Sequence, residues 1–474
     1  MEEVVSGRIR RSVYSFLALI ALVAGGCTST SRVDTMNVRS SSFYAPGLPY
    51  FTVDPDIEEH ASPDSSTVVL RLSIANASLT FLKAGDHFVA RYDILCRVFL
   101  PDGERPVYEG TWADTVTEAT YAGTQVLTPV HVAKRFPLAP GKYEVQVALQ
   151  DNDTRKMSSR WGNLHVPSLV TQHVGLGMLH VDIRDSKGGY EPIGPVYGRL
   201  SPDSLRVGVS LLTLAPGGEA TAEFILAQFT IDTSVASPPF TFSPFAGTFT
   251  FRGVDYEHPD TMMIGETTVE VPARSTHLEF YLPPLGEGMY LVTTRIRYDS
   301  TTLTQKKLFT IRAADFPRPT TLGELIEELR YLASDNEMTA IDTVRSPLDR
   351  KRAFDHFWLS RVRTESAAAN VLKLYYTRVQ EANMFFTCFK EGWKTDRGMV
   401  YIVLGPPGAV ERRFDLEIWR YSSADQDAPN TYVFKRSSTL AAESPFDNFV
   451  LQRQNYYERS WDRAIERWRA GAAF

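Results

Sequence analysis

Short runs of alternating apolar and polar residues fill the first two thirds of the chain. Such alternation indicates strands that bury one face, because successive side chains of a strand point to opposite sides of the sheet. Turn sequences such as PDGERP and APGK separate the runs, and no helical periodicity lies between them. Many short strands at this spacing predict a β-sandwich. The first set of predicted strands covers residues 67–76, 87–100, 107–114, 126–136 and 142–151.

Part of this pattern recurs about 147 residues further on. Residues 138–145 align with residues 285–292, and each segment places a Pro- or Gly-containing turn before a tyrosine, Tyr143 or Tyr290. This arrangement resembles the tyrosine corner of immunoglobulin-like sandwiches, in which the phenol bonds back to the backbone. We therefore predict a second sandwich, with strands at residues 205–214, 220–231, 247–253, 267–272, 277–282, 289–299 and 306–311.

Beyond residue 313 the pattern changes from strands to helices. Thr320 or Thr321 is predicted to cap a first helix, Ser346 a second and Thr364 a third. Three strand-like runs and a closing amphipathic helix follow at residues 417–421, 431–435, 449–452 and 455–469. This order of elements predicts an α+β domain.

The amino-terminus carries a predicted export signal. Three arginines within residues 8–11 precede an apolar segment, 13–24, that is too short to span a bilayer comfortably, and small residues then lead to Cys27. A cysteine at this place resembles the bacterial lipobox, in which the thiol is acylated; the alternative is an ordinary signal peptide with a chance cysteine. Because no Asp lies beside Cys27, the resemblance implies an outer-membrane lipoprotein that faces the periplasm or the surface, held by its acyl chains.

These patterns predict a multidomain, mostly β chain with two tandem immunoglobulin-like β-sandwiches followed by an α+β carboxy-terminal domain. A length of 474 residues suits several cores rather than one. The polar residues after the signal are expected to form a tether. The predicted boundaries are 1–27 for the lipoprotein signal peptide, 28–49 for the tether, 50–167 and 168–313 for the sandwiches, and 314–474 for the last domain.

Composition limits the partners and the cofactors. A formal net charge of −6 without a strongly basic segment argues against a nucleic-acid partner. Cys96 and Cys388 fall in different predicted domains, and neither has a second Cys or a His at metal-ligand spacing. We expect both to be buried apolar residues rather than a disulfide or metal ligands. No metal and no cofactor are predicted.

The most distinctive stretch is GWKTDRGMVYIVLGPPG, residues 392–408. Its apolar run, 399–404, lies between chain-breaking residues, which predicts a buried strand ended by the GPPG sequence. The opening Gly-Trp-x-Thr-Asp resembles the signature of the GWxTD-domain family of bacterial exported proteins. The blocks FDHFWLSR, YYTRVQEANMFF and LEIWRYS, in the order of the family, extend the likeness over residues 322–452. The resemblance implies fold and export, and it brings no catalytic residue.

The motif has a structural interpretation. Its first glycine would end the third helix with positive φ, and Trp393 would fill the gap between helix and sheet. Thr395 and Asp396 would bond forward to backbone amides. A basic neighbour, Lys394 or Arg397, would pair with Asp396. The structural residues on this interpretation are Gly392, Trp393, Thr395, Asp396, Gly405, Pro406 and Pro407.

A functional interpretation stands beside the structural one. The same side chains, with residues of neighbouring strands, would line a cleft in which charged groups beside an indole suit a glycan or a peptide. The candidate ligand-binding residues are Trp393, Lys394, Asp396, Arg397, Arg412, Trp419 and Tyr421.

Common sequence signatures of catalysis do not occur in the chain. GPPG is not followed by the Lys-Ser or Lys-Thr of a phosphate loop, and GxGxxG, HExxH and GxSxG are absent from the sequence. His356, the one histidine of the last predicted domain, is expected to be partly buried rather than a base. A pair of carboxylates for glycoside hydrolysis stays open, since the spacing it needs is spatial.

The leading hypothesis is a non-enzymatic, lipid-anchored envelope protein whose last domain binds an envelope protein or a glycan. The first alternative is an envelope enzyme that acts on glycan or peptide in the motif cleft. The second makes the sandwiches the binding modules and the last domain a structural cap.

Overall fold

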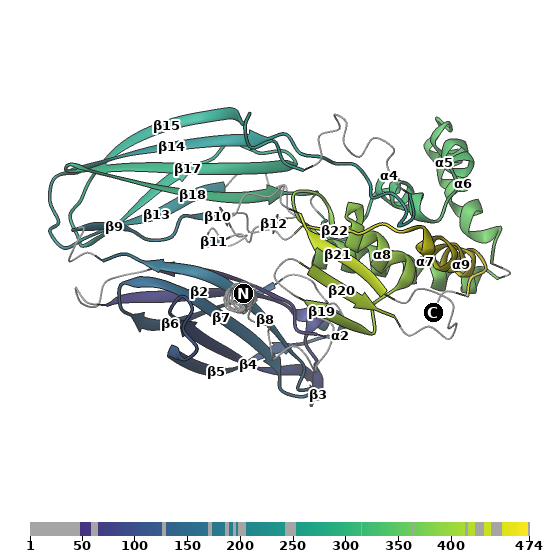
Figure 1. The fold of residues 1–474 in the computed structure, drawn as a ribbon, viewed down its shortest axis with the longest axis horizontal. Helices are drawn as coiled ribbons and strands as arrows, with labels where there is room; N and C mark the ends of the chain where they lie inside the picture. Colours follow the sequence, from purple (N-terminus) through teal and green to yellow (C-terminus); the bar gives the residue numbers. More distant parts are fainter. Residues whose placement is uncertain are drawn as a thin grey trace, which may run out of the picture.

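The computed structural model describes residues 48–57, 65–125, 129–168, 173–184, 189–192, 196–197, 205–241, 253–313, 315–362, 364–412, 416–421, 431–437 and 448–472. The predicted signal peptide, the predicted lipidation site Cys27 and nearly all of the predicted tether lie outside these residues, as does most of the predicted strand at 247–253. The described part is mostly β, with several antiparallel sheets followed by a helical carboxy-terminal region, in agreement with the coarse prediction (Figure 1).

The first region, residues 48–168, consists of two sheets that share one core. Its strands are β1 (Phe51–Ile57), β2 (Ser66–Ala75), β3 (Leu82–Ala84), β4 (His87–Phe99), β5 (Pro106–Glu118), β6 (Pro129–Leu138), β7 (Gly141–Asp151) and β8 (Met157–Val166). One sheet has the order β1-β2-β6, and the other has the order β3-β4-β7-β8 with β5 beside β4. The predicted alternation is confirmed along β4, where Tyr92, Ile94 and Cys96 point into the core.

The second region, residues 173–313, repeats this sandwich-like plan around a core of its own. Its strands are β9 (Val174–Leu176), β10 (His180–Arg184), β11 (Tyr190–Pro192), β12 (Val196–Tyr197), β13 (Leu205–Thr213), β14 (Glu219–Phe229), β15 (Asp260–Glu270), β16 (Ser275–Tyr281), β17 (Gly288–Tyr298) and β18 (Thr301–Ile311). One sheet runs β11-β10-β13-β16 with β9 beside β13, and the other runs β12-β18-β17-β14-β15. Among the described pairs, β12 and β18 are parallel and the rest are antiparallel.

The two predicted tyrosine contacts are confirmed. Tyr143 donates its hydroxyl proton to the Ala139 carbonyl over 2.8 Å, and Tyr290 donates to the Gly286 carbonyl over 3.0 Å. In both cases the acceptor lies four residues upstream, and both rings are buried in their cores. The same local hydrogen bond therefore fixes the chain at the start of β7 and of β17.

The carboxy-terminal region, residues 315–472, packs helices and a small sheet around one aromatic-rich core. Its helices are α4 (Leu322–Glu327), α5 (Asp335–Asp342), α6 (Pro347–Leu359), α7 (Glu365–Phe386), α8 (Asp396–Leu404) and α9 (Glu458–Arg469), and its strands are β19 (Ala409–Arg412), β20 (Leu416–Arg420), β21 (Thr431–Arg436) and β22 (Phe449–Leu451). The sheet lies on the side nearer the first two regions, with α5, α6 and α9 beyond it (Figure 1). None of the described helices has the length and apolar character needed to cross a membrane.

The predicted helix starts are confirmed. The side chains of Thr321, Ser346 and Thr364 each accept a hydrogen bond from the backbone N–H three residues further on, and so cap α4, α6 and α7. α5 was not predicted, although it begins with a capping box between Ser334 and Glu337. The first predicted helix is short: α4 is followed directly by a 3-10 turn, η2 (Glu328–Tyr331).

The predicted strand at residues 399–404 is wrong, because this segment belongs to α8. Thr395 caps the helix by accepting a bond from the Gly398 N–H over 3.0 Å, and Asp396 in the first turn suits the positive end of the helix dipole. Residues 399–403 are all buried. A helix that is apolar on every side gives a continuous apolar run, and such a run does not distinguish a buried helix from a buried strand.

Tyr50 lies between the first region and α7. The Tyr50 N–H donates to Ser78 Oγ over 2.7 Å, and the Tyr50 ring meets the ring of Phe385 edge-on at 5.8 Å between centroids. The guanidinium of Arg160 lies over the same tyrosine ring at 5.6 Å. Tyr50 therefore joins the first region to the carboxy-terminal region.

The first and second regions also meet directly. Leu212 points outward from β13 and belongs to the core of the first region. The Met178 N–H donates to Asp56 Oδ1 over 3.1 Å, next to the end of β1. Contacts thus join the first region to both of the others among the described residues.

Candidate functional site

The motif begins where the chain crosses over α7. Gly392 opens a 3-10 turn, η3 (Gly392–Lys394), and a Cβ on Gly392 would lie 1.9 Å from the Ala382 carbonyl oxygen. Gly398 repeats this approach, since its Cβ would lie 1.9 Å from the Gly392 carbonyl oxygen. The predicted positive φ at Gly392 is wrong. Glycine is required there because two backbones touch, not because the chain turns left-handed.

Trp393 is buried, as the structural interpretation predicted, but its ring contacts Tyr331 of η2, a contact that the predicted place between helix and sheet did not include. Its ring lies edge-on to Tyr331 at 6.1 Å between centroids, and the Tyr331 hydroxyl donates to the Trp393 carbonyl over 2.6 Å. The Trp393 N–H donates to Asn383 Oδ1 over 3.0 Å. Both backbone groups of the tryptophan are therefore held by side chains of the core, and its own side chain, 4% exposed, offers little area to a ligand.

Asp396 bonds to the end of the sheet rather than to its own turn. One carboxylate oxygen accepts the Leu451 N–H over 2.8 Å, and the two oxygens accept the Arg453 guanidinium over 2.6 and 3.1 Å. The predicted pairing of Asp396 with Lys394 or Arg397 is wrong. The turn and the first residues of α8 direct those two side chains elsewhere, Lys394 toward glutamates and Arg397 into the core.

Arg397 forms a buried ion pair on the inner side of α8. Its Nη1 lies 3.4 Å from Glu417 Oε2, and the Trp419 indole N–H donates to the other oxygen of that carboxylate over 2.6 Å. The Arg397 and Glu417 side chains are 4% and 0% exposed. The rings of Phe386 and Phe449 lie 5.3 and 4.8 Å from the guanidinium carbon. These contacts make the pair a part of the core.

Lys394 lies among glutamates on the opposite side of η3. Its Nζ is 3.3 Å from Glu391 Oε2 and 3.7 Å from Glu327 Oε1. Beside them Glu328 is buried, and desolvation, followed by repulsion from Glu324 and Glu327, raises the pKa of its carboxyl to about 9. Glu328 is therefore protonated at neutral pH. The sequence offered no signal for this, because burial of a helical glutamate depends on how the helix is packed.

A segment of the second region runs along the motif. We call residues 230–241, which follow β14, the strap. The Ala236 N–H donates to the Lys394 carbonyl over 3.1 Å, and Lys390 Nζ donates to the Ser234 carbonyl over 2.7 Å. Three strap residues also pack against the core of the carboxy-terminal region: Val235, Ala236 and Phe240. The strap was not predicted, because it bonds to the carboxy-terminal region through its own backbone groups, which no residue pattern reports.

The Asp396 pair reaches the same strap. Arg453, which binds Asp396, also donates from Nη2 to the Ser237 carbonyl over 3.0 Å. The next N–H, of Gln454, donates to the Pro239 carbonyl over 3.2 Å. The acid of the motif thus ties together α8, the chain after β22 and the strap.

A second contact between the same two regions lies at the end of α7. Arg312, buried at the end of β18, donates to the carbonyls of Cys388 and Phe389 over 3.3 and 2.6 Å. Phe229 and Met289 of the second region share a small apolar cluster with Cys388 and Phe389. The expectation that Cys388 is a buried apolar residue is confirmed.

Two of the remaining candidate residues, Trp419 and Tyr421, have side chains that contact protein groups. Trp419 is fully buried in the core, and the Tyr421 hydroxyl donates to the Gly405 carbonyl over 3.0 Å. Gly405 ends α8 with a φ of 86°, so the predicted stop at this glycine is confirmed. Arg412 lies in β19, but its side chain is outside the described part of the structure. That these residues bind a ligand stays a prediction.

His356 is exposed on α6, so the expectation of a partly buried histidine is wrong. The helix turns Phe354, Phe357 and Trp358 inward and leaves the histidine on its outer face. Within the described residues, no group of three or more His, Cys, Asp or Glu side chains is placed to hold a metal ion.

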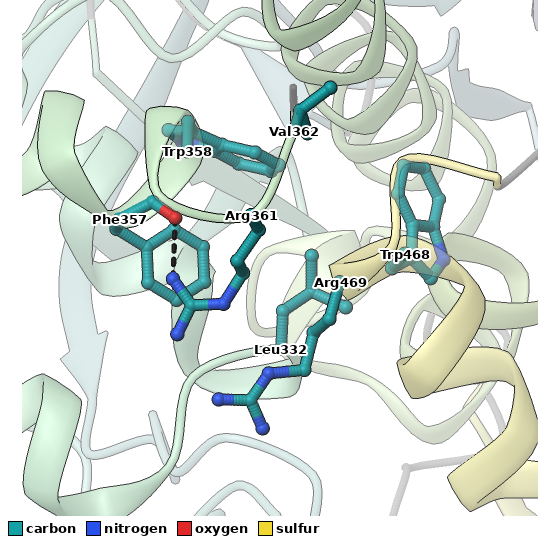
Figure 2. A pocket seen from close by; sticks show the side chains of 7 residues that line it. All are labelled: Leu332, Phe357, Trp358, Arg361, Val362, Trp468 and Arg469. Carbon is teal, nitrogen blue, oxygen red and sulfur yellow. Dashed lines mark hydrogen bonds between the residues drawn. The ribbon is translucent and has the colours of Figure 1, made fainter.

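Figure 2 shows a small cavity between the turn after η2, the end of α6 and α9. Its volume of about 10 Å³ suits a single water molecule, which is far too little for a glycan or a peptide. Arg361 and Arg469 at its rim both pair with the single carboxylate of Glu337. The lining residues, none of them a candidate from the motif, are Leu332, Phe357, Trp358, Arg361, Val362, Trp468 and Arg469.

The fold and the motif define a mostly β, multi-sheet protein with a helical carboxy-terminal region organised around residues 392–408. The sequence model of the GWxTD domain matches residues 288–470, so this part of the chain is a GWxTD domain. The match begins at the first residue of β17. It therefore includes the two strands of the second region that carry Met289 and lead to Arg312.

Solved structures resemble the chain only faintly. The crystal structure of red sea bream transglutaminase matches at 10% identity over 55% of this chain and 31% of that chain, with a TM-score of 0.16. A Salmonella alpha-2-macroglobulin mutant matches at 16% identity over 61% and 16% of the two chains, with a TM-score of 0.18. The carboxy-terminal domain of the Streptococcus agalactiae AgI/II polypeptide BspA matches at 10% identity over 56% and 100%, with a TM-score of 0.16.

The chain thus spans less than a third of the transglutaminase and of the macroglobulin. Scores this low carry no argument about the function or the fold of this chain. A comparison with curated protein sequences finds no match.

Proposed function

We propose that the protein is a lipid-anchored, non-enzymatic component of the bacterial cell envelope. Its second region and its GWxTD domain act as one rigid body that binds a partner, an envelope protein or a glycan. The first two regions are immunoglobulin-like sandwiches. This assignment is supported by the two tyrosine contacts, which have the geometry expected where such a sandwich turns into its late strand.

One observation carries the proposal: the acid of the motif bonds across the boundary between regions. Asp396 holds Arg453, and Arg453 holds the strap carbonyl of Ser237. Backbone bonds from Ala236 to Lys394 and from Gln454 to Pro239 lie on either side of this bridge. A surface that is fixed at several points changes shape little, and a preorganised surface binds a partner at a smaller entropic cost.

The contacts of the motif support a binding role over catalysis. A general acid or base must lie within hydrogen-bond reach of a substrate proton. Asp396, Arg397 and Lys394 are instead engaged with protein groups, and Trp393 is buried. This arrangement supports the view that the side chains of the motif shape the body rather than act on a bound molecule.

The coupling is tested by hydrogen exchange on Arg453→Ala. Exchange at the Ala236 and Gln454 amides reports local opening of the strap. We expect faster exchange at both amides, and unchanged exchange at the amides of β17. The matched control is Arg420→Ala, which removes an exposed arginine that pairs with Glu411 of the same sheet rather than with the strap. Unchanged exchange at Ala236 in Arg453→Ala would show that the motif does not couple the regions.

The anchor is tested by fractionation of cells that produce Cys27→Ala. Acylation of a cysteine holds a protein to lipid, so loss of the thiol is expected to move the chain from the membrane to the soluble fraction. Cys96→Ala serves as the control, because that cysteine is buried in the first region. Membrane association that survives Cys27→Ala contradicts the anchor.

The partner is sought by crosslinking the whole mature protein in envelope preparations, in parallel with Arg453→Ala. If the rigid body is the binding surface, a captured partner is retained by Arg420→Ala and weakened by Arg453→Ala. Equal capture by all three proteins would assign the partner to another part of the chain.

A further inference from the structure

Two histidines meet on the outer face of the second region. His180 on β10 lies opposite Gly208 of β13, and His277 on β16 lies diagonal to that glycine. The two imidazole rings are nearly parallel, with centroids 5.5 Å apart. Both Nε2 atoms lie within 3.0 Å of the point that a Cβ on Gly208 would occupy. A side chain at this position would separate the rings, so the glycine allows the two nitrogens to converge.

Each ring has a partner for its other nitrogen. His180 Nδ1 lies 3.3 Å from the Met178 carbonyl oxygen, and His277 Nδ1 lies 3.4 Å from Ser210 Oγ. An imidazole that donates from Nδ1 leaves the lone pair on Nε2 free, which is the arrangement found behind metal-bound histidines.

The charges around the rings favour a cation. Asp182 Oδ2 lies 3.7 Å from His180 Nε2, and Glu279 Oε1 lies 3.5 Å from His277 Nε2. One guanidinium, that of Arg206, pairs with both carboxylates. With neutral imidazoles the cluster therefore carries one net negative charge. The second oxygen of Asp182 is buried and has no hydrogen-bond partner among the described groups.

We propose that His180 and His277 chelate a divalent transition-metal ion of the zinc or copper class, with water completing the coordination. Imidazole nitrogen suits these ions better than it suits magnesium or calcium. The carboxylates are already engaged by Arg206, so the two imidazoles are the ligands that this face offers. The site is independent of the proposed envelope role, and it lies on a different region from the GWxTD motif.

Calorimetric titration of the untagged protein with zinc chloride tests the site, and the continuous-wave EPR spectrum with one equivalent of Cu²⁺ reports nitrogen ligation. We expect one ion per chain. His277→Gln and His180→Gln are each expected to weaken binding more than tenfold, and Gly208→Ala is expected to do the same by separating the rings. His258→Gln is the control, because His258 is an exposed histidine beside a carboxylate, Asp255, on another part of the region.

His277→Gln carries the test if Gly208→Ala fails to fold, since the His277 side chain is 39% exposed and its loss leaves no cavity. Thermal melting of each variant without metal checks the fold. Absence of stoichiometric zinc binding by the parent protein overturns the proposal. Binding that persists unchanged in His277→Gln, or that is lost equally in His258→Gln, overturns it as well.

Discussion

Two neighbouring residues of the motif form arginine–carboxylate pairs on opposite sides of α8, and the pairs differ in what they hold. On the inner side, Arg397 and Glu417 are 4% and 0% exposed and lie within one core. On the outer side, Arg453 and Asp396 are 17% and 9% exposed, and the arginine reaches the strap of another region. The difference teaches that one motif can do two tasks at once: its inner side holds a domain together and its outer side joins that domain to the next.

Removing one partner should lower the free energy of unfolding by different amounts for the inner pair and the outer pair. A charge left alone in a water-free core loses its solvation without compensation, whereas a charge left near the surface is partly solvated. The inner pair should therefore govern the stability of the whole carboxy-terminal region, and the outer pair should govern the attachment of the strap. The following substitutions test this division, from the largest expected effect to the smallest.

Glu417→Ala is expected to have the largest effect, because it removes a fully buried carboxylate that pairs with Arg397 and accepts a hydrogen bond from the Trp419 indole N–H. Breaking a buried pair from one side costs about 3–5 kcal/mol. Urea denaturation monitored by tryptophan fluorescence measures the change. The control is Glu411→Ala, which removes the carboxylate of an exposed pair on the same sheet. A decrease in the free energy of unfolding below about 1 kcal/mol, the range of surface ion pairs, would contradict a larger role for the inner pair than for the outer pair.

Asp396→Ala is expected to rank second. It removes charge-assisted bonds from Arg453 and the Leu451 N–H, each kind contributing about 1.5–3 kcal/mol. Arg453→Ala should cost less, because Asp396 keeps the Leu451 bond. A double-mutant cycle between the two residues, measured by calorimetric unfolding, gives their coupling energy. Additive effects would contradict the pairing, and a loss as large as that of Glu417→Ala would remove the distinction between the sides.

Glu328→Gln sharpens the comparison through pH. The folded-state pKa of Glu328, raised to about 9, lies above the value of an exposed glutamate, so the folded protein binds the proton more tightly. Its stabilising contribution is complete below pH about 4.5 and falls as the pH rises toward 9, by at most about 1.4 kcal/mol per pH unit. Melting temperatures at pH 6 and 8.5 should converge in Glu328→Gln. If the melting temperature of Glu328→Gln still falls between pH 6 and 8.5 as much as that of the parent protein, another group causes the loss of stability.

Tyr143→Phe and Tyr290→Phe are expected to have the smallest effect, about 1 kcal/mol each, because each removes one hydrogen bond to a carbonyl. The two variants differ in what else should respond. Tyr290 follows Met289, which packs against the end of α7, so its loss should also speed exchange in residues 387–390. Tyr143 lies in the first region and should leave those amides unchanged. Equal exchange of the amides of residues 387–390 in both variants would show that a change at Tyr290 in β17 does not affect the end of α7.

The strands and the tyrosine contacts were predictable from sequence because each depends on local information. Alternation fixes which face of β4 or β17 is buried, and a turn four residues before a tyrosine brings its hydroxyl to the right carbonyl. Caps at Thr321, Ser346 and Thr364 are likewise local, since a side chain bonds to an amide three residues away.

The site resisted prediction where its contacts are distant in sequence. α8 gives the same apolar run as a strand, because it is buried on every side. The partner of Asp396 is 57 residues away and the strap more than 150, so proximity along the chain pointed instead to Lys394 and Arg397. Gly392 was correctly singled out but for the wrong reason, since a sequence does not show which backbone passes over which.

Tyr50 limits how far the protein can reach. It fixes the start of the folded body to the seam between the first region and α7. On the proposed anchor, Tyr50 follows the acylated Cys27 by 23 residues, and a chain of that length can span at most about 80 Å. The seam that Tyr50 occupies can therefore lie no further than that from the lipid surface, and a deletion between the two residues would lower this limit.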